Sequence, residues 1–182
     1  MELKWKMKIL YDTNILIHIN DPKELSPNLQ SLLAIIREHG HQEVIHPASQ
    51  KDIENDNDIG RRKVTLSKLF GYPFLPSPPK PDDNFISLVG PPTNSHDEND
   101  NEILYSLQKN LVDFLITEDK GIKNKASLLN LDDRVFSIEA ALDYFNVMYQ
   151  RFSPSHSLLR KMYAHEINID QSFFDSLKED YG

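Results

Sequence analysis

Short apolar runs alternate along this chain with longer segments in which apolar residues recur at helical spacing. The apolar runs have the length and composition of buried strands and lie at residues 9–11, 43–46, 112–117 and 134–136. The helical segments lie at residues 26–40, 49–56, 61–69, 99–109, 121–129 and 138–149. Strands that alternate with helices through short links form a parallel sheet with helices on both faces. We therefore predict an α/β domain built on a central parallel sheet.

Two local signals refine this prediction. Ser26 followed by Pro27 is typical of a helix start, and Ser49 is the expected cap of the helix at 49–56. Seven prolines between residues 73 and 92 exclude a regular helix or a central strand through them. We interpret this stretch as an extended surface connection, with a lid or a partner-binding arm as the alternative.

Bulk composition limits the class of protein. A chain of 182 residues suffices for one domain, and its lack of cysteine removes disulfides and thiolate metal sites. No apolar run approaches the roughly 18 residues that cross a bilayer, and the first residues lack an apolar signal core. We expect a cytoplasmic protein that does not enter membranes.

Acidic residues stand at comparable places on this map. Asp12 and Asp119 each follow an apolar strand, and Asp52 follows the second strand along the chain. Asp100 lies in the first turn of the helix that precedes the strand at 112–117, and Asp97 could share its face. Parallel sheets bind ligands outside the carboxyl ends of their strands, so we expect these carboxylates to converge there. Taken singly, each Asp is equally explained as a helix cap or a strand-end residue.

A converging set of carboxylates needs a compensating cation. Two unit charges about 4 Å apart repel by roughly 4 kcal/mol at an effective dielectric constant near 20. Hard oxygen ligands without thiolates or paired histidines favour Mg²⁺ or Mn²⁺. Such ions activate water and orient a phosphodiester for cleavage, which also reconciles phosphate chemistry with a net charge of -8.

The same residues resemble the PIN domain family. The resemblance covers residues 7–149 and rests on four segments of the chain: residues 9–16 with their Asp-Thr-Asn sequence, 47–53, 100–103 and the Leu-Ile-Thr-Glu-Asp run at 115–119. It implies a three-layer α/β/α sandwich and a Mg²⁺- or Mn²⁺-dependent endoribonuclease. It also implies frequent homodimers and, for the toxin members of the family, a protein antitoxin.

Carried over residue by residue, the resemblance gives a complete candidate site. The metal-holding and catalytic residues would be Asp12, Asp52, Asp100 and Asp119, supported by Asn14 and Thr117. The family more often has Glu where this chain has Asp52. The shorter side chain leaves Glu54 or Asp56 as alternatives at that position, as Asp97 is beside Asp100.

Basic residues and the end of the chain supply the remaining expectations. The candidate RNA contacts come from two basic clusters, whose alternative explanation is a solvated face: Arg61, Arg62, Lys120 and Lys123. We assign residues 1–150 to the PIN-like domain. Residues 151–182 resemble the connector to an acetyltransferase domain, with a tail packed on its own domain or on a second copy as the alternative.

Three functions compete at this stage. The first is a metal-dependent ribonuclease that acts on RNA. The second is a non-catalytic PIN-like module that binds RNA or protein and serves an attached domain. The third, a phosphatase with an Asp nucleophile, is disfavoured because Asn14 stands where a second Asp is expected.

Overall fold

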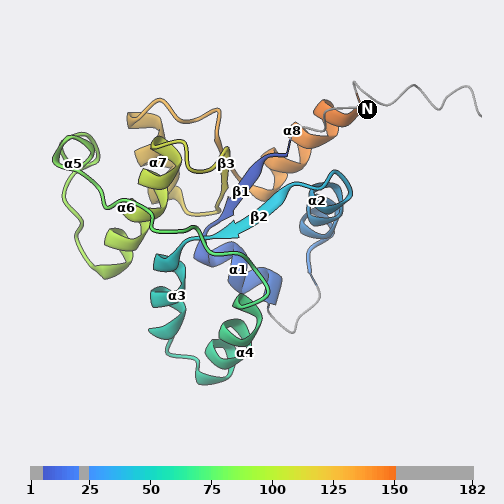
Figure 1. The fold of residues 1–182 in the computed structure, drawn as a ribbon, viewed down its shortest axis with the longest axis horizontal. Coiled ribbons are helices and arrows are strands. Elements are labelled where there is room, and N and C mark those ends of the chain that lie inside the picture. The colour runs from blue at the N-terminus through green and yellow to red at the C-terminus, as the bar shows by residue number, and fades with distance from the viewer. Residues whose placement is uncertain (1–5, 21–24, 151–182) are drawn as a thin grey trace, which may run out of the picture. The chain divides into compact units, whose positions relative to one another are not determined.

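The computed structural model describes residues 6–20 and 25–150, which form four strands and eight helices (Figure 1). The strands are β1 (Lys8–Tyr11), β2 (Gln42–Ile45), β3 (Phe114–Ile116) and β4 (Val135–Phe136). The helices are α1 (Thr13–Asn20), α2 (Pro27–Glu38), α3 (Pro47–Glu54), α4 (Ile59–Leu69), α5 (Asp83–Val89), α6 (Ser95–Gln108), α7 (Lys120–Leu128) and α8 (Ile138–Gln150). The described residues as far as Val147 belong to one compact unit. The predicted tail at 151–182 lies outside the described residues.

All four strands belong to one parallel sheet with the order β2-β1-β3-β4. Leu10 in β1 lies opposite Val44 in β2 and Leu115 in β3, and Leu115 lies opposite Val135 in β4. The buried residues of these strands are apolar on both sides because helices cover both faces, as is usual for a parallel sheet. The prediction of an α/β domain with a central parallel sheet is confirmed.

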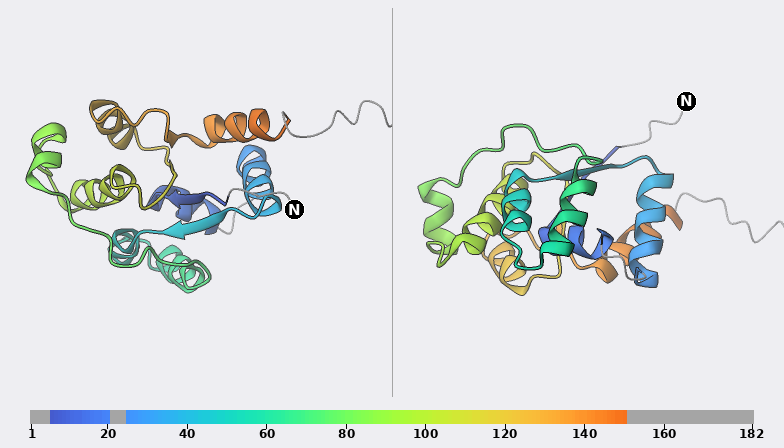
Figure 2. Two further views of the ribbon diagram at one scale, coloured as in Figure 1. Left: turned by 45° about the horizontal axis from the view of Figure 1, so that its top comes forward. Right: turned by 90° about the horizontal axis from the view of Figure 1, so that it is seen from below.

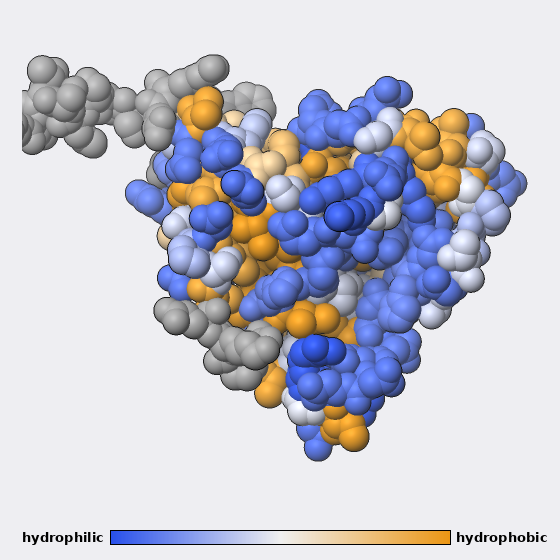
Figure 3. All heavy atoms as spheres, turned by 180° about the vertical axis from the view of Figure 1, so that it is seen from behind, coloured by the Kyte–Doolittle hydropathy of each residue, from blue (hydrophilic) through white to orange (hydrophobic). Residues whose placement is uncertain are grey.

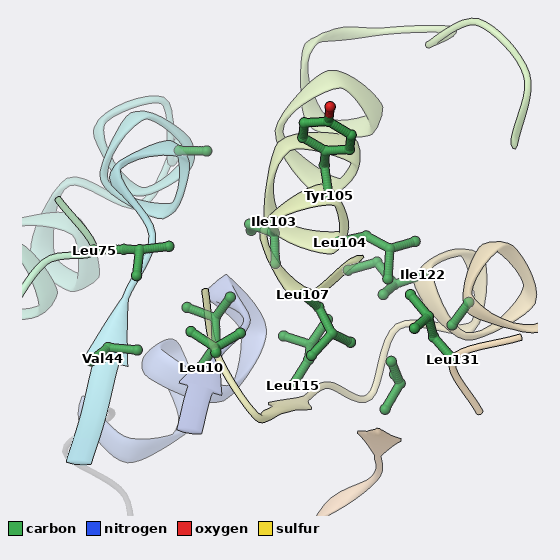
Figure 4. Packing of buried hydrophobic residues seen from close by; sticks show 14 of the residues in the cluster. Leu10, Val44, Leu75, Ile103, Leu104, Tyr105, Leu107, Leu115, Ile122 and Leu131 are labelled. Carbon is green, nitrogen blue, oxygen red and sulfur yellow. The ribbon is translucent and has the colours of Figure 1, made fainter. Parts of the chain in front are cut away.

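Alternate strand residues point to opposite faces of the sheet. On one face, Leu10, Val44, Leu115 and Val135 join a buried cluster with residues of α3, α5, α6 and α7 (Figure 4). On the other face, Phe114 packs edge-on against Phe145 of α8, with ring centres 6.2 Å apart. Helices therefore lie on both sides of the sheet (Figure 2), an arrangement compatible with three α/β/α layers.

The sequence analysis did not predict where α1 and α3 start. Helix α1 starts at Thr13, directly after Asp12, because the Leu16 N–H already donates to the Asp12 carbonyl oxygen at 3.1 Å. Helix α3 starts at Pro47, so the expected Ser49 cap is wrong and Ser49 is buried within the helix. The cap is His46, whose Nδ1 accepts from the Ala48 N–H at 3.0 Å. Proline at the first helical position favours this earlier start.

The proline-rich stretch is also more ordered than an extended connection. Phe74 forms a parallel bridge with Ile45 at the outer edge of β2, so the segment extends the sheet there. Helix α5 occupies Asp83–Val89, is capped by Asp82 and buries Phe85 completely. Prolines flank this helix and do not interrupt it, which is why a count of prolines across 73–92 concealed it.

The described surface is mostly hydrophilic. On the face opposite to that of Figure 1, several separate apolar patches interrupt it, one of them at the α4 end (Figure 3). Large exposed apolar side chains are Ile59, Val64, Phe70, Leu88, Leu128 and Val147. Among the described residues, no helix combines the length and the apolar composition needed to cross a bilayer.

Candidate active site

Two aspartates at the carboxyl edge of the sheet are linked through one buried threonine. Asp12 directly follows β1, and Asp119 caps α7 after β3. The hydroxyl of Thr117 donates to Asp12 Oδ2 at 2.6 Å and accepts from the Asp119 N–H at 2.9 Å. Because β1 and β3 are parallel neighbours, their carboxyl ends meet at this edge. Asp12 and Asp119 therefore share one environment.

Asp12 is held by three donors in a nearly closed setting. Besides Thr117, it accepts from the Thr13 N–H and from Asn14 Nδ2, each at 2.6 Å, and only 3% of the residue is exposed. The pKa of Asp12 is raised to about 6. Burial is the largest cause and the charge of Asp119 adds to it, while the hydrogen bonds act in the opposite direction. A buried carboxylate beside another carboxylate is stabilised by any cation that enters the site.

Asp100 lies in the second turn of α6, because this helix begins at Ser95, earlier than the predicted start at 99. The pKa of Asp100 is raised to about 7. Burial is the largest cause, and the charges of Asp12, Asp119 and Asp52 contribute to the same increase. No described residue donates a hydrogen bond to its carboxylate. Asp100 therefore differs from Asp12, Asp52 and Asp119, whose carboxylates each accept a hydrogen bond.

Asp52, in the last turn of α3, is held between two other helices. Its Oδ1 lies 2.6 Å from Asn99 Nδ2 and 2.8 Å from His96 Nδ1, both in α6. Its Oδ2 lies 3.4 Å from the Thr13 hydroxyl in α1. The sequence analysis missed His96 and Asn99, although their spacing of three places them on one helical face. We call Asp12, Asp52, Asp100 and Asp119 the carboxylate cluster.

The alternative acidic residues have other partners. Glu54 is exposed and accepts from Gln50 Nε2 at 2.7 Å. Asp97 accepts from the Thr93 N–H at 2.8 Å and from Lys125 Nζ. Burial acts to raise the pKa of Asp97, but the Lys125 and Thr93 contacts outweigh it and the pKa is lowered.

The four basic residues predicted to contact RNA differ in their partners within the protein. Arg61 makes two hydrogen bonds to the Asp56 carboxylate, at 2.6 and 2.7 Å, so Asp56 is also occupied. Arg62 Nη1 reaches two main-chain carbonyl oxygens of the segment between α3 and α4, each at 3.3 Å. Lys123 Nζ lies 3.7 Å from Glu118, and Lys120 is exposed at the start of α7. A role for these four residues in RNA binding stays a prediction.

Two smaller contacts shape the position of Asp119. Asp119 Oδ1 accepts from the Ile122 N–H at 3.0 Å, and a Cβ at Gly121 would lie only 2.9 Å from that oxygen. Gly121 therefore leaves room for the carboxylate, a role the sequence did not indicate. Asn14 connects the two strand ends, because its Oδ1 lies 3.5 Å from the Glu118 N–H while its Nδ2 donates to Asp12.

The donor atoms of the carboxylate cluster suit a divalent ion, but its side chains are not arranged in a complete coordination sphere. Its donors are all hard oxygens, which suit Mg²⁺ or Mn²⁺. Within residues 6–20 and 25–150, however, no three His, Asp or Glu side chains are placed to hold one ion together. A pocket of about 530 Å³ lies elsewhere, and none of the four carboxylates lines it; its residues are Arg37, His41, Gln42, Glu43, Gly71, Tyr72 and Pro73.

Comparison with known proteins adds no assignment. No protein-family model, no curated protein and no solved structure matches this chain.

Proposed function

We propose that this chain is a PIN-like, divalent-metal-dependent endoribonuclease that hydrolyses RNA phosphodiester bonds at the carboxylate cluster. The observation that carries the proposal is the electrostatic coupling of four carboxylates from four segments. Asp12 and Asp100 have pKa values raised first by burial and then by the charges of other cluster members. Such an arrangement is unfavourable without a cation, so its presence is best explained by a cation that binds during function.

The side chains of the cluster would hold Mg²⁺ or Mn²⁺, which supplies a positive charge to the phosphate and an activated water. Hydrolysis requires that water attack phosphorus while the ribose oxygen leaves. Thr117 orients Asp12, and Asn99 with Thr13 orients Asp52. Gly121 leaves room for the Asp119 carboxylate, which accepts from the Ile122 N–H at 3.0 Å. These residues fix the carboxylates before substrate arrives, which reduces reorganisation during the reaction.

The non-catalytic alternative is supported by one observation. The described residues contain no ready coordination group for an ion. A PIN-like module that binds RNA or protein without cleaving it would need none. The two functions differ in whether a divalent ion binds to the cluster at all.

Cleavage of a fluorescent single-stranded RNA with Mn²⁺ or Mg²⁺ tests the proposal. We expect cleavage by the wild type, none with a chelator, and a loss in Asp119→Asn above the 10- to 100-fold typical for residues that merely support a ligand. Asp133→Asn, which removes an exposed carboxylate before β4, is the matched control. RNA binding without Mn²⁺ binding or cleavage would instead establish the non-catalytic module.

A further inference from the structure

One lysine lies inside the acidic region and is held in place there. Lys125 belongs to α7, and only 16% of its side chain is exposed. Its Nζ donates to Asp97 Oδ1 and, at 2.7 Å, to Asn101 Oδ1. Asp97 and Asn101 are four residues apart on α6 and stand on either side of Asp100 in the sequence. The ammonium group is therefore fixed beside the helix that carries Asp100.

The contacts of Lys125 bring its charge to the part of α6 that carries Asp100. Its partner Asp97 lies three residues before Asp100 and its partner Asn101 directly follows Asp100, so these residues lie within about one turn of the helix. The same lysine joins α7, which begins at the Asp119 cap, to α6, which carries Asp100. Neither Asp97 nor Asn101 belongs to the cluster, so Lys125 can keep its bonds while an ion occupies the carboxylates.

We propose that Lys125 is a built-in cation that stabilises the carboxylate cluster when no metal is bound and weakens the binding of the divalent ion. The proposal rests on the proposed function, because it concerns the ion that function requires. Lys125 acts as a positioning residue, since it reaches the cluster through α6. A fixed single positive charge offsets part of the repulsion and permits the apo protein to fold. The same charge repels an incoming divalent ion and keeps its binding reversible.

Coulomb's law gives the expected change in the affinity for the divalent ion. A unit charge about 10 Å from a divalent ion changes its affinity roughly fourfold in water at low ionic strength, and more where the surroundings are less polar. Salt screens the interaction, with a Debye length of about 10 Å at 0.1 M. Measurements at low ionic strength therefore give the largest difference in Mn²⁺ affinity.

Mn²⁺ titration calorimetry and metal-free melting temperatures of the wild type, three lysine variants and Asp119→Asn test the inference. In Lys125→Met we expect a lower metal-free melting temperature together with a Mn²⁺ dissociation constant about fourfold lower than in the wild type. Lys125→Arg keeps the charge and should resemble the wild type. Lys109→Met removes a lysine that pairs with Asp82 at 3.2 Å, away from the cluster, and should leave Mn²⁺ affinity unchanged.

The outcomes separate this inference from the proposed function. If the wild type binds Mn²⁺ and Asp119→Asn does not, the metal site stands whatever Lys125→Met shows. Unchanged or weaker Mn²⁺ binding by a folded Lys125→Met protein overturns the built-in cation. If Lys125→Met does not fold without metal, recovery of its fold by Mn²⁺ supports the inference and failure to recover refutes it. If the wild type binds no Mn²⁺, both proposals fail.

Discussion

Replacing Asp100 with Asn should stabilise the metal-free protein, and increasingly so as the pH rises. Burial and neighbouring carboxylates raise the pKa of Asp100 from 3.8 to about 7 in the folded state. The unfolded chain therefore loses its proton near pH 4, whereas the folded chain keeps it until about pH 7. Stability is full below the unfolded pKa and falls as the pH rises through the folded pKa. Asn is uncharged at every pH and resembles the protonated carboxyl group.

The magnitude follows from the pKa difference. About three units at 1.36 kcal/mol each set an upper limit near 4 kcal/mol for the stability that wild type loses between pH 4 and pH 8. Asp100 is partly exposed, so solvent screening reduces this to about 2 kcal/mol. We expect Asp100→Asn to exceed the wild type by about 2 kcal/mol at pH 8 and by little at pH 4.

Urea unfolding in chelator-treated buffer measures this difference. The control is Asp133→Asn, which should change the free energy of unfolding by less than about 0.5 kcal/mol at both pH values. A variant that is less stable than the wild type at pH 8, or a difference independent of pH, would refute the electrostatic reasoning. Asp100 is a cleaner position for this test than Asp12, because an amide at Asp12 would lose acceptors that three donors now use.

Two further substitutions test how the site is held. Thr117→Val removes the hydroxyl between Asp12 and Asp119. In denaturant titrations it should lower the free energy of unfolding by about 1–3 kcal/mol. Thr117→Ser keeps the hydroxyl and should keep most of the wild-type stability. Gly121→Ala should displace the Asp119 carboxylate, so we expect weaker Mn²⁺ binding in calorimetry. Its melting temperature should change little, because alanine's higher helix propensity offsets the weakened cap; unaltered Mn²⁺ affinity would contradict this reasoning.

The sequence indicated the sheet and its edge because those features depend on local pattern. Apolar runs ending in Asp12 and Asp119 predict parallel strands, and parallel strands place their carboxyl ends together. Helix α2 was predicted for the same reason, since Ser26 and Pro27 are local signals and Ser26 does accept from the Leu29 N–H. Local signals were not sufficient everywhere, because the cap expected at Ser49 lies inside α3, which begins at Pro47.

Other features depend on distant contacts and were not predicted. Helix α5 is stabilised by burying Phe85 against Tyr105 of α6, with ring centres 5.1 Å apart, which no signal within the proline-rich stretch reveals. The sequence analysis assigned no role to Lys125, because its pairing with Asp97 depends on the packing of α7 on α6. A charge in sequence does not tell whether it faces solvent or a partner.

The contacts of Asp52 indicate that its short side chain has a structural consequence of its own. Asp52 is bonded to α1 through Thr13 and to α6 through His96 and Asn99, so it joins the helix after Asp12 to the helix that carries Asp100. A longer glutamate would carry its carboxylate beyond these donors. The short side chain of Asp52 thus keeps its carboxylate between α1 and α6, where it fixes these helices, and does not extend it far into the cluster. On this argument, Asp52 also holds the helices of Asp12 and Asp100 near each other, in addition to its place in the carboxylate cluster.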